Sequence, residues 1–142
     1  MNLFGQGVAG LPRPEPLDFQ QLVLPSSPNA AFAAPPGFPV QAQLDTPLFP
    51  VPPEQLFETM KALAVTFPRT WLLADWPELK QAQWVERSAM LGFPDIIVAQ
   101  AVPRESGSGL LLYSRSRYGW SDFGVNRKRV EKWIAGLEMA VR

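Results

Sequence analysis

Cysteine and histidine are both absent from the 142-residue sequence. Without thiolates or imidazoles, the chain lacks the ligands of a tetrahedral Cys/His zinc site and the group needed for thiol redox chemistry. It also lacks the histidine base on which most catalytic triads depend. We therefore expect no bound metal and no cofactor, and we expect most familiar small-enzyme mechanisms to be excluded.

Excess charge and long apolar runs are missing as well. The 13 basic and 13 acidic residues give a formal net charge of zero, which argues against general nucleic-acid binding because that depends on many Lys and Arg contacts to phosphates. No apolar run approaches the roughly 20 residues that cross a bilayer, and the first residues lack the pattern of a signal peptide. We expect a protein that is cytoplasmic or peripheral to a membrane and has no transmembrane segment of its own.

Proline is abundant, but only in the first part of the chain, where residues 1–53 hold twelve of the 16 prolines. These prolines alternate with Leu, Phe and Val, and few charges accompany them, which favours an extended, polyproline-like arm over a disordered tail. The sequence predicts that residues 1–53 form no regular structure. The arm is expected to pack in apolar grooves of its own domain or, in part, on a partner.

Residues 54–142 have the pattern of one compact domain. An amphipathic helix is predicted over 54–67 and another from Asn126 onwards, with Asn126 as its N-cap. Four strands are predicted between them, over residues 69–76, 81–88, 95–102 and 109–117. Their short connections require antiparallel neighbours. The predicted fold is α+β, with the order α-β-β-β-β-α, a four-stranded antiparallel meander and both helices on one face of the sheet.

The most specialised stretch is SRSRYGWSDFGVNRKRV (114–130), which joins the last strand to the last helix. It places five cations around one acid, Asp122; the five are Arg115, Arg117, Arg127, Lys128 and Arg129. The last three fall in the first turn of the helix, where the helix dipole disfavours positive charge. Gly119 and Gly124 allow tight turns. Such a corner is compatible with anion binding, because helix N–H groups and Arg side chains both donate to phosphate or carboxylate.

The same residues fit a structural alternative. Asp122 could pair with Arg115 or Arg117, and Glu86 and Glu131 could pair with the other cations, so that the corner would be a salt-bridged clasp between strand and helix. Both interpretations give Asp122 the role of organising guanidinium groups. An aromatic set in this loop, either packed or exposed as a contact surface, consists of Tyr118, Trp120 and Phe123.

Catalysis is the weaker hypothesis. The serines of this stretch have no histidine base, Asp122 has no second carboxylate at a fixed spacing, and the chain contains neither a GxxxxGK nor a GxGxxG phosphate-binding loop.

These residues resemble a known family. SRSRYGWSDFGVNRKRVEKW is similar to the C-terminal signature of domain of unknown function 1499, a family of bacterial and plastid proteins, and LPSSPNAAFAAPP is similar to its N-terminal Ser-Pro-Asn motif. RSAMLGFPD (87–95) is similar to the version in relatives from photosynthetic and related alphaproteobacteria. The resemblance covers Pro25 to Leu137. No activity follows from it.

Two departures from the family pattern limit which properties of the relatives can be expected of this chain. Many relatives carry cysteines beside the Ser-Pro-Asn motif, where this chain has Leu24 and Ala30, so a metal or disulfide role for those cysteines does not apply here. Many relatives also carry an N-terminal membrane segment or export signal, which this sequence lacks.

We therefore expect a non-catalytic binding or assembly module. Its basic corner would engage an acidic protein surface, a lipid headgroup or a small anion, and its partner would be a protein, or a complex at a membrane, rather than nucleic acid. The expected binding residues are Arg115, Arg117, Asp122, Asn126, Arg127 and Arg129. The alternative is an enzyme that acts on an anionic small molecule in a pocket near Asp122.

Overall fold

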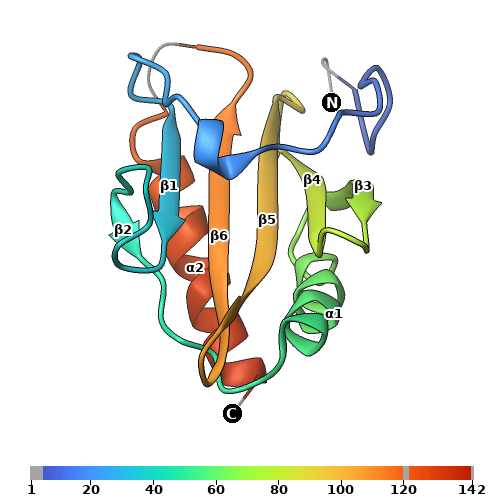
Figure 1. The fold of residues 1–142 in the computed structure, drawn as a ribbon. Coiled ribbons are helices and arrows are strands. Elements are labelled where there is room, and N and C mark those ends of the chain that lie inside the picture. The colour runs from blue at the N-terminus through green and yellow to red at the C-terminus, as the bar shows by residue number, and fades with distance from the viewer. Residues whose placement is uncertain (1–4, 120–121, 142) are drawn as a thin grey trace.

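The structure is a computed structural model that describes residues 5–119 and 122–141. Two α-helices and one six-stranded sheet confirm the predicted α+β class (Figure 1). The elements in chain order are the 3-10 helix η1 (Phe19–Gln21), β1 (Ala30–Ala34), β2 (Leu44–Asp45), α1 (Pro53–Ala64), β3 (Thr70–Trp76), β4 (Gln81–Arg87), β5 (Pro94–Arg104), β6 (Gly107–Ser116) and α2 (Val125–Ala140).

The sheet is larger than the sequence predicted. Strands β3 to β6 form the expected antiparallel meander, but the full order is β2-β1-β6-β5-β4-β3. Strand β1 pairs antiparallel with β6, and β2 pairs parallel with β1, so the sheet is mixed and not purely antiparallel. The prediction that residues 1–53 hold no regular structure is therefore wrong. The segment between Pro28 and Pro35 is free of proline and supplies every N–H group that a strand ladder needs.

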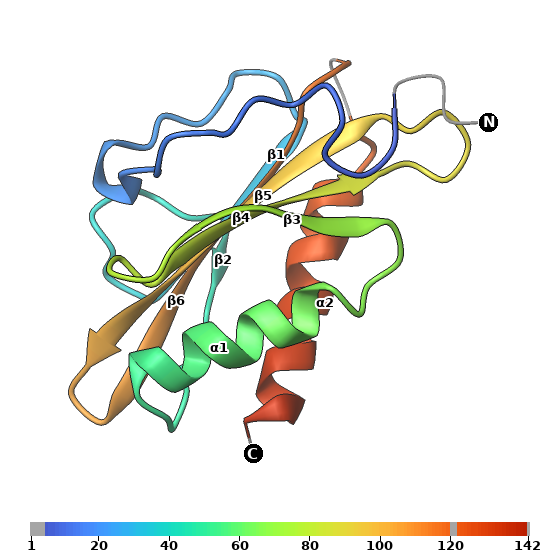
Figure 2. The ribbon, with the colours of Figure 1, turned by 90° about the vertical axis from the view of Figure 1, so that its right-hand side faces the viewer.

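Both helices cover one face of the sheet, as predicted (Figure 2). Leu56 and Met60 of α1 and Trp133 and Leu137 of α2 are almost completely buried there. The ring of Trp133 packs edge to face on that of Trp84 in β4, with 5.1 Å between centroids. This packing stabilises the helices, because the apolar stripe of each helix is removed from water when it packs on the sheet.

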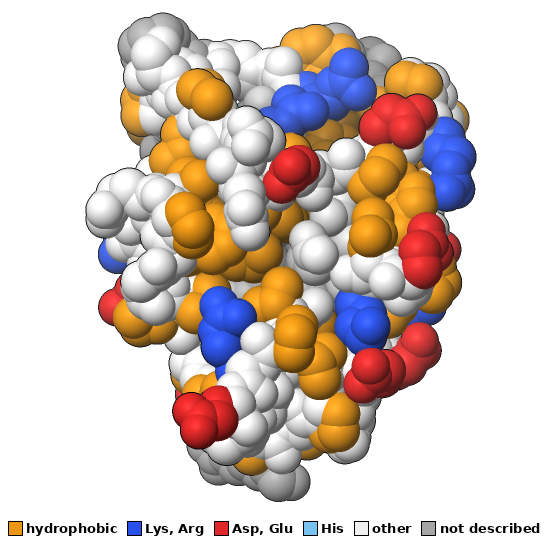
Figure 3. Space-filling view, viewed as in Figure 1, with side chains coloured by type: hydrophobic (Ala, Val, Ile, Leu, Met, Phe, Trp, Pro, Cys, Tyr) orange, Lys and Arg blue, Asp and Glu red, His pale blue; other side chains and the backbone are white. Residues whose placement is uncertain are grey.

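Much of the proline-rich arm, including Leu11, Phe19 and Phe38, packs on the opposite face of the sheet (Figure 2), whereas Phe49 and Val51 near its end pack on the helix side. The arm forms a few backbone hydrogen bonds of its own in turns, such as Leu11 N–H to Val8 O, but its extended parts need other partners for their polar groups. Side chains of β4 supply them: Gln81 exchanges two hydrogen bonds with the backbone of Leu17, at 2.7 and 2.8 Å, and Arg87 Nε donates to Gly7 O at 2.9 Å. Figure 3 shows this arm-bearing face, with hydrophobic side chains gathered over its middle.

One end of the sheet concentrates the sequence motifs. The ends of β4 and β6 and the starts of β1 and β5 lie there, as the strand register shows. The β5–β6 hairpin lies at the opposite end (Figure 1). Within residues 5–119 and 122–141, no helix has the length and apolar character that crossing a membrane requires.

Candidate functional site

The Ser-Pro-Asn motif and the C-terminal signature meet at this end of the sheet. The carbonyl of Asn29 accepts from the backbone N–H of Ser116 at 2.9 Å, and the side-chain amide of Asn29 donates to Gly119 O at 2.9 Å. The backbone N–H of Asp122 donates to Pro28 O at 3.3 Å. Two motifs that lie about ninety residues apart in the chain therefore form one structural unit.

Asn126 is the centre of this unit. Its side chain is completely buried, and its Oδ1 accepts from Ser114 Oγ at 2.5 Å and from Arg129 Nη1 at 2.7 Å. Its Nδ2 shares two protons among three acceptors, Asp122 Oδ2 at 2.6 Å, Ser116 Oγ at 2.9 Å and Asn29 O at 3.1 Å. The prediction of Asn126 as N-cap is wrong, because α2 begins at Val125 and Asn126 points into the core instead.

Asp122 takes the role that the sequence assigned to Asn126. Its Oδ1 accepts from the backbone N–H of Gly124 at 2.8 Å, and its Oδ2 accepts from that of Asn126 at 3.2 Å. A carboxylate in this position is stabilised by the unpaired N–H groups and the dipole at the helix start. Within the described part of the chain, the Asp122 carboxylate pairs with these groups and forms no ion pair with Arg115 or Arg117.

Arg129 is held in a buried clasp. Its side chain is 7% exposed, and its guanidinium binds both oxygens of Glu86 at 3.0 and 3.2 Å and Asp95 Oδ2 at 3.0 Å. Glu86 and Asp95 are cross-strand partners on β4 and β5. For Arg129 and Glu86, the structure thus has the expected clasp, and Asp95 is a partner that the sequence analysis missed.

Burial raises the pKa of the Asp95 carboxyl above its usual range. The Arg129 charge and hydrogen bonds from Arg129 and Ser116 act in the opposite direction, and the nearby Glu86 charge adds a smaller rise. The direction of the shift shows that one guanidinium, shared between two carboxylates, does not fully compensate the loss of water around Asp95.

The other cations are separated from this clasp. Arg117, Arg127 and Lys128 are exposed, and Arg115 is partly buried. Arg115 lies opposite Ala30 and Ile96 in the strand register, on the face that the arm covers. The five cations therefore do not converge on one point. Of the residues that the structure describes, none forms an ion pair with these four side chains.

An open pocket of about 470 Å³ lies beside the clasp. Glu86, Asp95 and Arg129 contribute to its polar lining, and Phe93 and Tyr118 line it from the loops after β4 and β6. The rings of Phe93 and Tyr118 lie 6.1 Å apart at an angle of 51°. No local pattern in the sequence indicates this pocket, because Glu86, Asp95 and Ser116 come from three strands, Arg129 comes from α2, and they meet only in the folded chain.

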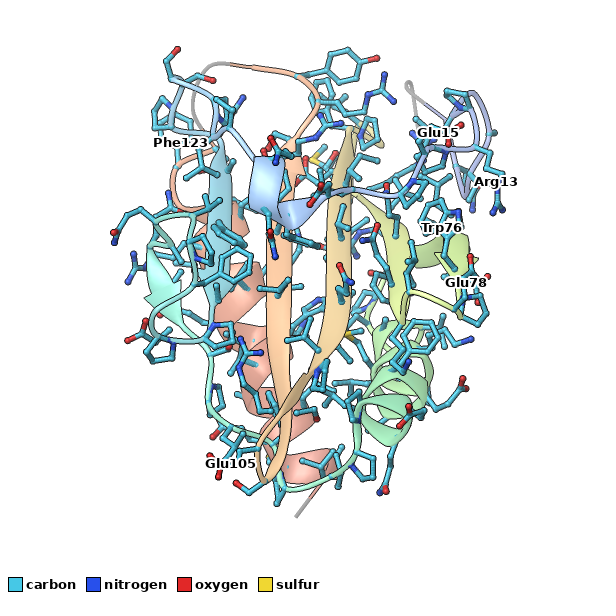
Figure 4. The ribbon with its side chains drawn as sticks, in the orientation of Figure 1. Arg13, Glu15, Trp76, Glu78, Glu105 and Phe123 are labelled. Carbon is cyan, nitrogen blue, oxygen red and sulfur yellow. The ribbon has the colours of Figure 1, made fainter. Side chains whose placement is uncertain are left out.

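Two of the three aromatic residues of the loop, Phe123 and Tyr118, are described by the structure, and both are exposed. Phe123 is 91% exposed and Tyr118 is 54% exposed, which places both on the surface rather than in the core. Figure 4 shows Phe123 at the end of the molecule opposite Glu105 of the β5–β6 hairpin. Trp120, the third expected contact, and Ser121 lie outside the described residues.

Comparison with known proteins supports the resemblance seen in the sequence. The model of a protein family described as "Protein of unknown function (DUF1499)" matches residues 23–137. This match includes both motifs and every element from β1 to most of α2. No curated protein and no solved structure matches the chain.

Proposed function

The chain belongs to the DUF1499 family, and from this premise we propose that it is a non-catalytic binding module that docks on an anionic lipid surface. The docking corner consists of Arg117, Phe123, Arg127 and Lys128, which are all exposed, whereas Arg115 faces the arm-bearing side of the sheet and is not part of it. One observation carries the proposal: Phe123 is 91% exposed and lies in the sequence between Arg117 and Arg127, which form no ion pair with the described residues.

The backbone at Phe123 supports a functional role for this side chain. Its φ is 54°, in the left-handed region that bulky residues disfavour. Exposure of an apolar ring and a left-handed backbone both cost free energy. Burial of the ring in the interfacial region of a bilayer would offset part of this cost.

The charges around Phe123 favour an anionic surface. Each Lys or Arg near such a membrane contributes about 1 kcal/mol, so the three exposed cations of the corner contribute about 3 kcal/mol at low salt. Burying one phenylalanine contributes a further 1.5–3 kcal/mol, approximately. The same corner is less suited to a dry protein interface, where unpaired cations would lose their water.

A catalytic role has weaker support. Two cavities border Asp122. In that of about 470 Å³, the described charged lining consists of Glu86, Asp95 and Asp122 against Arg69 and Arg129, and this acidic excess disfavours the anionic substrate that the enzyme hypothesis requires. That of about 250 Å³ has, among the described residues, only Asp122 and Arg127 as charged lining and offers an anion a single cation. Ser114 also donates its hydroxyl proton to Asn126 Oδ1, and an amide oxygen is not a base that could activate the serine.

We expect the full chain to sediment with vesicles that contain phosphatidylglycerol and to stay in solution with vesicles of phosphatidylcholine alone. Added salt should release it, because exposed charges are screened. The double variant Arg117→Ala/Arg127→Ala should bind about thirtyfold more weakly, since it loses two cations at the membrane surface. Phe123→Asn should also weaken binding, by about tenfold, because asparagine tolerates the left-handed backbone but is not apolar.

The matched control is Arg104→Ala/Lys132→Ala, which removes the same charge from exposed positions outside the corner. It should bind almost as well as the parent chain. Thermal melting of each variant should stay close to that of the parent, because the substituted side chains are exposed. Equal binding by the two double variants would refute the docking corner, and unfolding of Arg117→Ala/Arg127→Ala would show that these residues serve the fold.

A further inference from the structure

We propose that the pocket between the β4–β5 loop and the β6–α2 loop binds an ammonium group, carried either by a free small molecule or by a lipid headgroup. This site is distinct from the docking corner in its chemistry, because it selects positive charge while the corner selects negative charge. The inference does not depend on membrane docking. Soluble probes can test it in the absence of any vesicle.

The charge of the pocket is the first argument. Three carboxylates and two guanidiniums line it, and the guanidinium of Arg129 is already engaged by Glu86 and Asp95. A ligand in the pocket is therefore close to one more carboxylate than guanidinium. The low dielectric beside the Glu86, Asp95 and Arg129 cluster strengthens the attraction of this excess negative charge for a cation. A cation is favoured over an anion of the same size.

The carboxylates also keep acceptor capacity. An ionised carboxylate has about four acceptor positions. Glu86 uses one on each oxygen for Arg129, and Asp95 is engaged by Arg129 and Ser116. Their side chains are still 21% and 15% exposed on the pocket side of the clasp. An ammonium ligand with N–H groups, such as ethanolamine, can therefore donate to oxygens that are already held in place, and a quaternary ammonium such as choline interacts with them through its charge alone.

Aromatic rings form the other part of the pocket wall. Phe93 and Tyr118 meet at 51° with their centroids 6.1 Å apart, and Phe123 also lines the cavity. Ring faces attract cations, and rings set at an angle around a small cavity are a known way of binding ammonium groups. The combination of tilted rings with half-buried carboxylates distinguishes this pocket from a purely apolar groove.

The state of Asp95 agrees with this assignment. Its pKa is raised chiefly by burial, so its negative charge is incompletely compensated in the unliganded protein. A bound ammonium group would add a second positive charge beside the Glu86, Asp95 and Arg129 cluster. Such a ligand would lower the pKa of Asp95 and would relieve the repulsion between the two carboxylates.

The decisive experiment titrates the full chain with choline and with its neutral carbon isostere, 3,3-dimethyl-1-butanol, followed by amide NMR. We expect choline to shift the signals of residues 88–93 and 116–119 and to bind about tenfold more tightly than the isostere. Equal binding of the two would reduce the site to an apolar pocket and would overturn the proposal. Absence of binding by choline and by ethanolamine would overturn it too.

A second pair of probes, phosphocholine and choline, distinguishes a lipid headgroup from a free small molecule as the source of the ammonium group. Phosphocholine carries the phosphate of a lipid headgroup. The guanidinium of Arg69, which lines the pocket, could donate hydrogen bonds to this phosphate. Tighter binding of phosphocholine than of choline would identify a headgroup as the ligand. Tighter binding of choline would identify a free amine.

One variant tests the aromatic contribution without breaking the clasp. Tyr118→Leu keeps an apolar side chain but removes the ring face, so we expect the affinity for choline to fall about fivefold while that for the neutral isostere stays unchanged. Met139→Leu, at an exposed position near the far end of α2, is the matched control and should change neither affinity. A parallel loss of both ligands in Tyr118→Leu would indicate a structural role for Tyr118 and would contradict the cation preference.

Discussion

Replacing Asn126 with alanine is expected to destabilise the protein by about 3 kcal/mol or more. The side chain is completely buried and holds five side-chain and backbone partners together. Its loss removes the acceptor of the Ser114 hydroxyl proton and one of the two donors to the Asn29 carbonyl, in a site that water does not reach easily. Buried polar groups that lose their partners cost more than the hydrogen bond contributed.

Urea unfolding measures this effect, with the midpoint and the slope reported separately. The matched control is Arg127→Ala, the neighbouring exposed position of the same helical turn, which should change the unfolding free energy by less than about 0.5 kcal/mol. If Asn126→Ala costs no more than Arg127→Ala, the hydrogen-bonded unit does not hold the two motifs together.

Arg129→Met is expected to destabilise the protein by about 3–5 kcal/mol near neutral pH. The substitution leaves Glu86 and Asp95 facing one another without the cation that both bind. Like charges with little access to water repel strongly, and methionine fills the volume but compensates neither. Lys128→Met, one residue earlier and exposed, removes the same charge and should have little effect.

The deficit of Arg129→Met should depend on pH in a definite direction. The pKa of Asp95 is higher in the folded state than in the unfolded state. Protonation of this carboxyl therefore stabilises the fold fully at a pH below the unfolded-state pKa, and this stabilisation is lost as pH rises through the folded-state pKa. Removing Arg129 raises that pKa further. The deficit relative to the parent chain should therefore shrink as pH falls from about 7 towards about 4. A deficit that stays constant over this interval would contradict the buried-charge explanation.

Local patterns predicted the elements that depend on local chemistry. The helices and strands β3 to β6 were expected near the observed ranges, since period and turn residues specify them. Strands β1 and β2 were missed because proline density dominated the interpretation of residues 1–53. The ladder partner of β1 is β6, which lies about eighty residues further along the chain, and a single sequence carries no direct sign of such a pairing.

The candidate site was predicted only in part, because a single sequence carries no direct sign of its tertiary contacts. The charged corner and its key residues, Asp122, Asn126 and Arg129, were identified from their spacing, but their roles depend on tertiary contacts. Asn126 has the chemistry of an N-cap, yet it lies inside the first turn and bonds to Asn29 from the other motif. Asp95 was missed because it faces Arg129 only through the alignment of β5 with β4 and α2.

The docking corner is tested most directly by amide NMR of the full chain with phosphatidylglycerol vesicles that carry a spin-labelled lipid. The account predicts that signals of residues 117–119 and 122–128 lose the most intensity. The signals around Glu105 in the opposite hairpin should keep theirs (Figure 4). Strongest attenuation at the hairpin or across the arm-bearing face, or none at any residue, would contradict it.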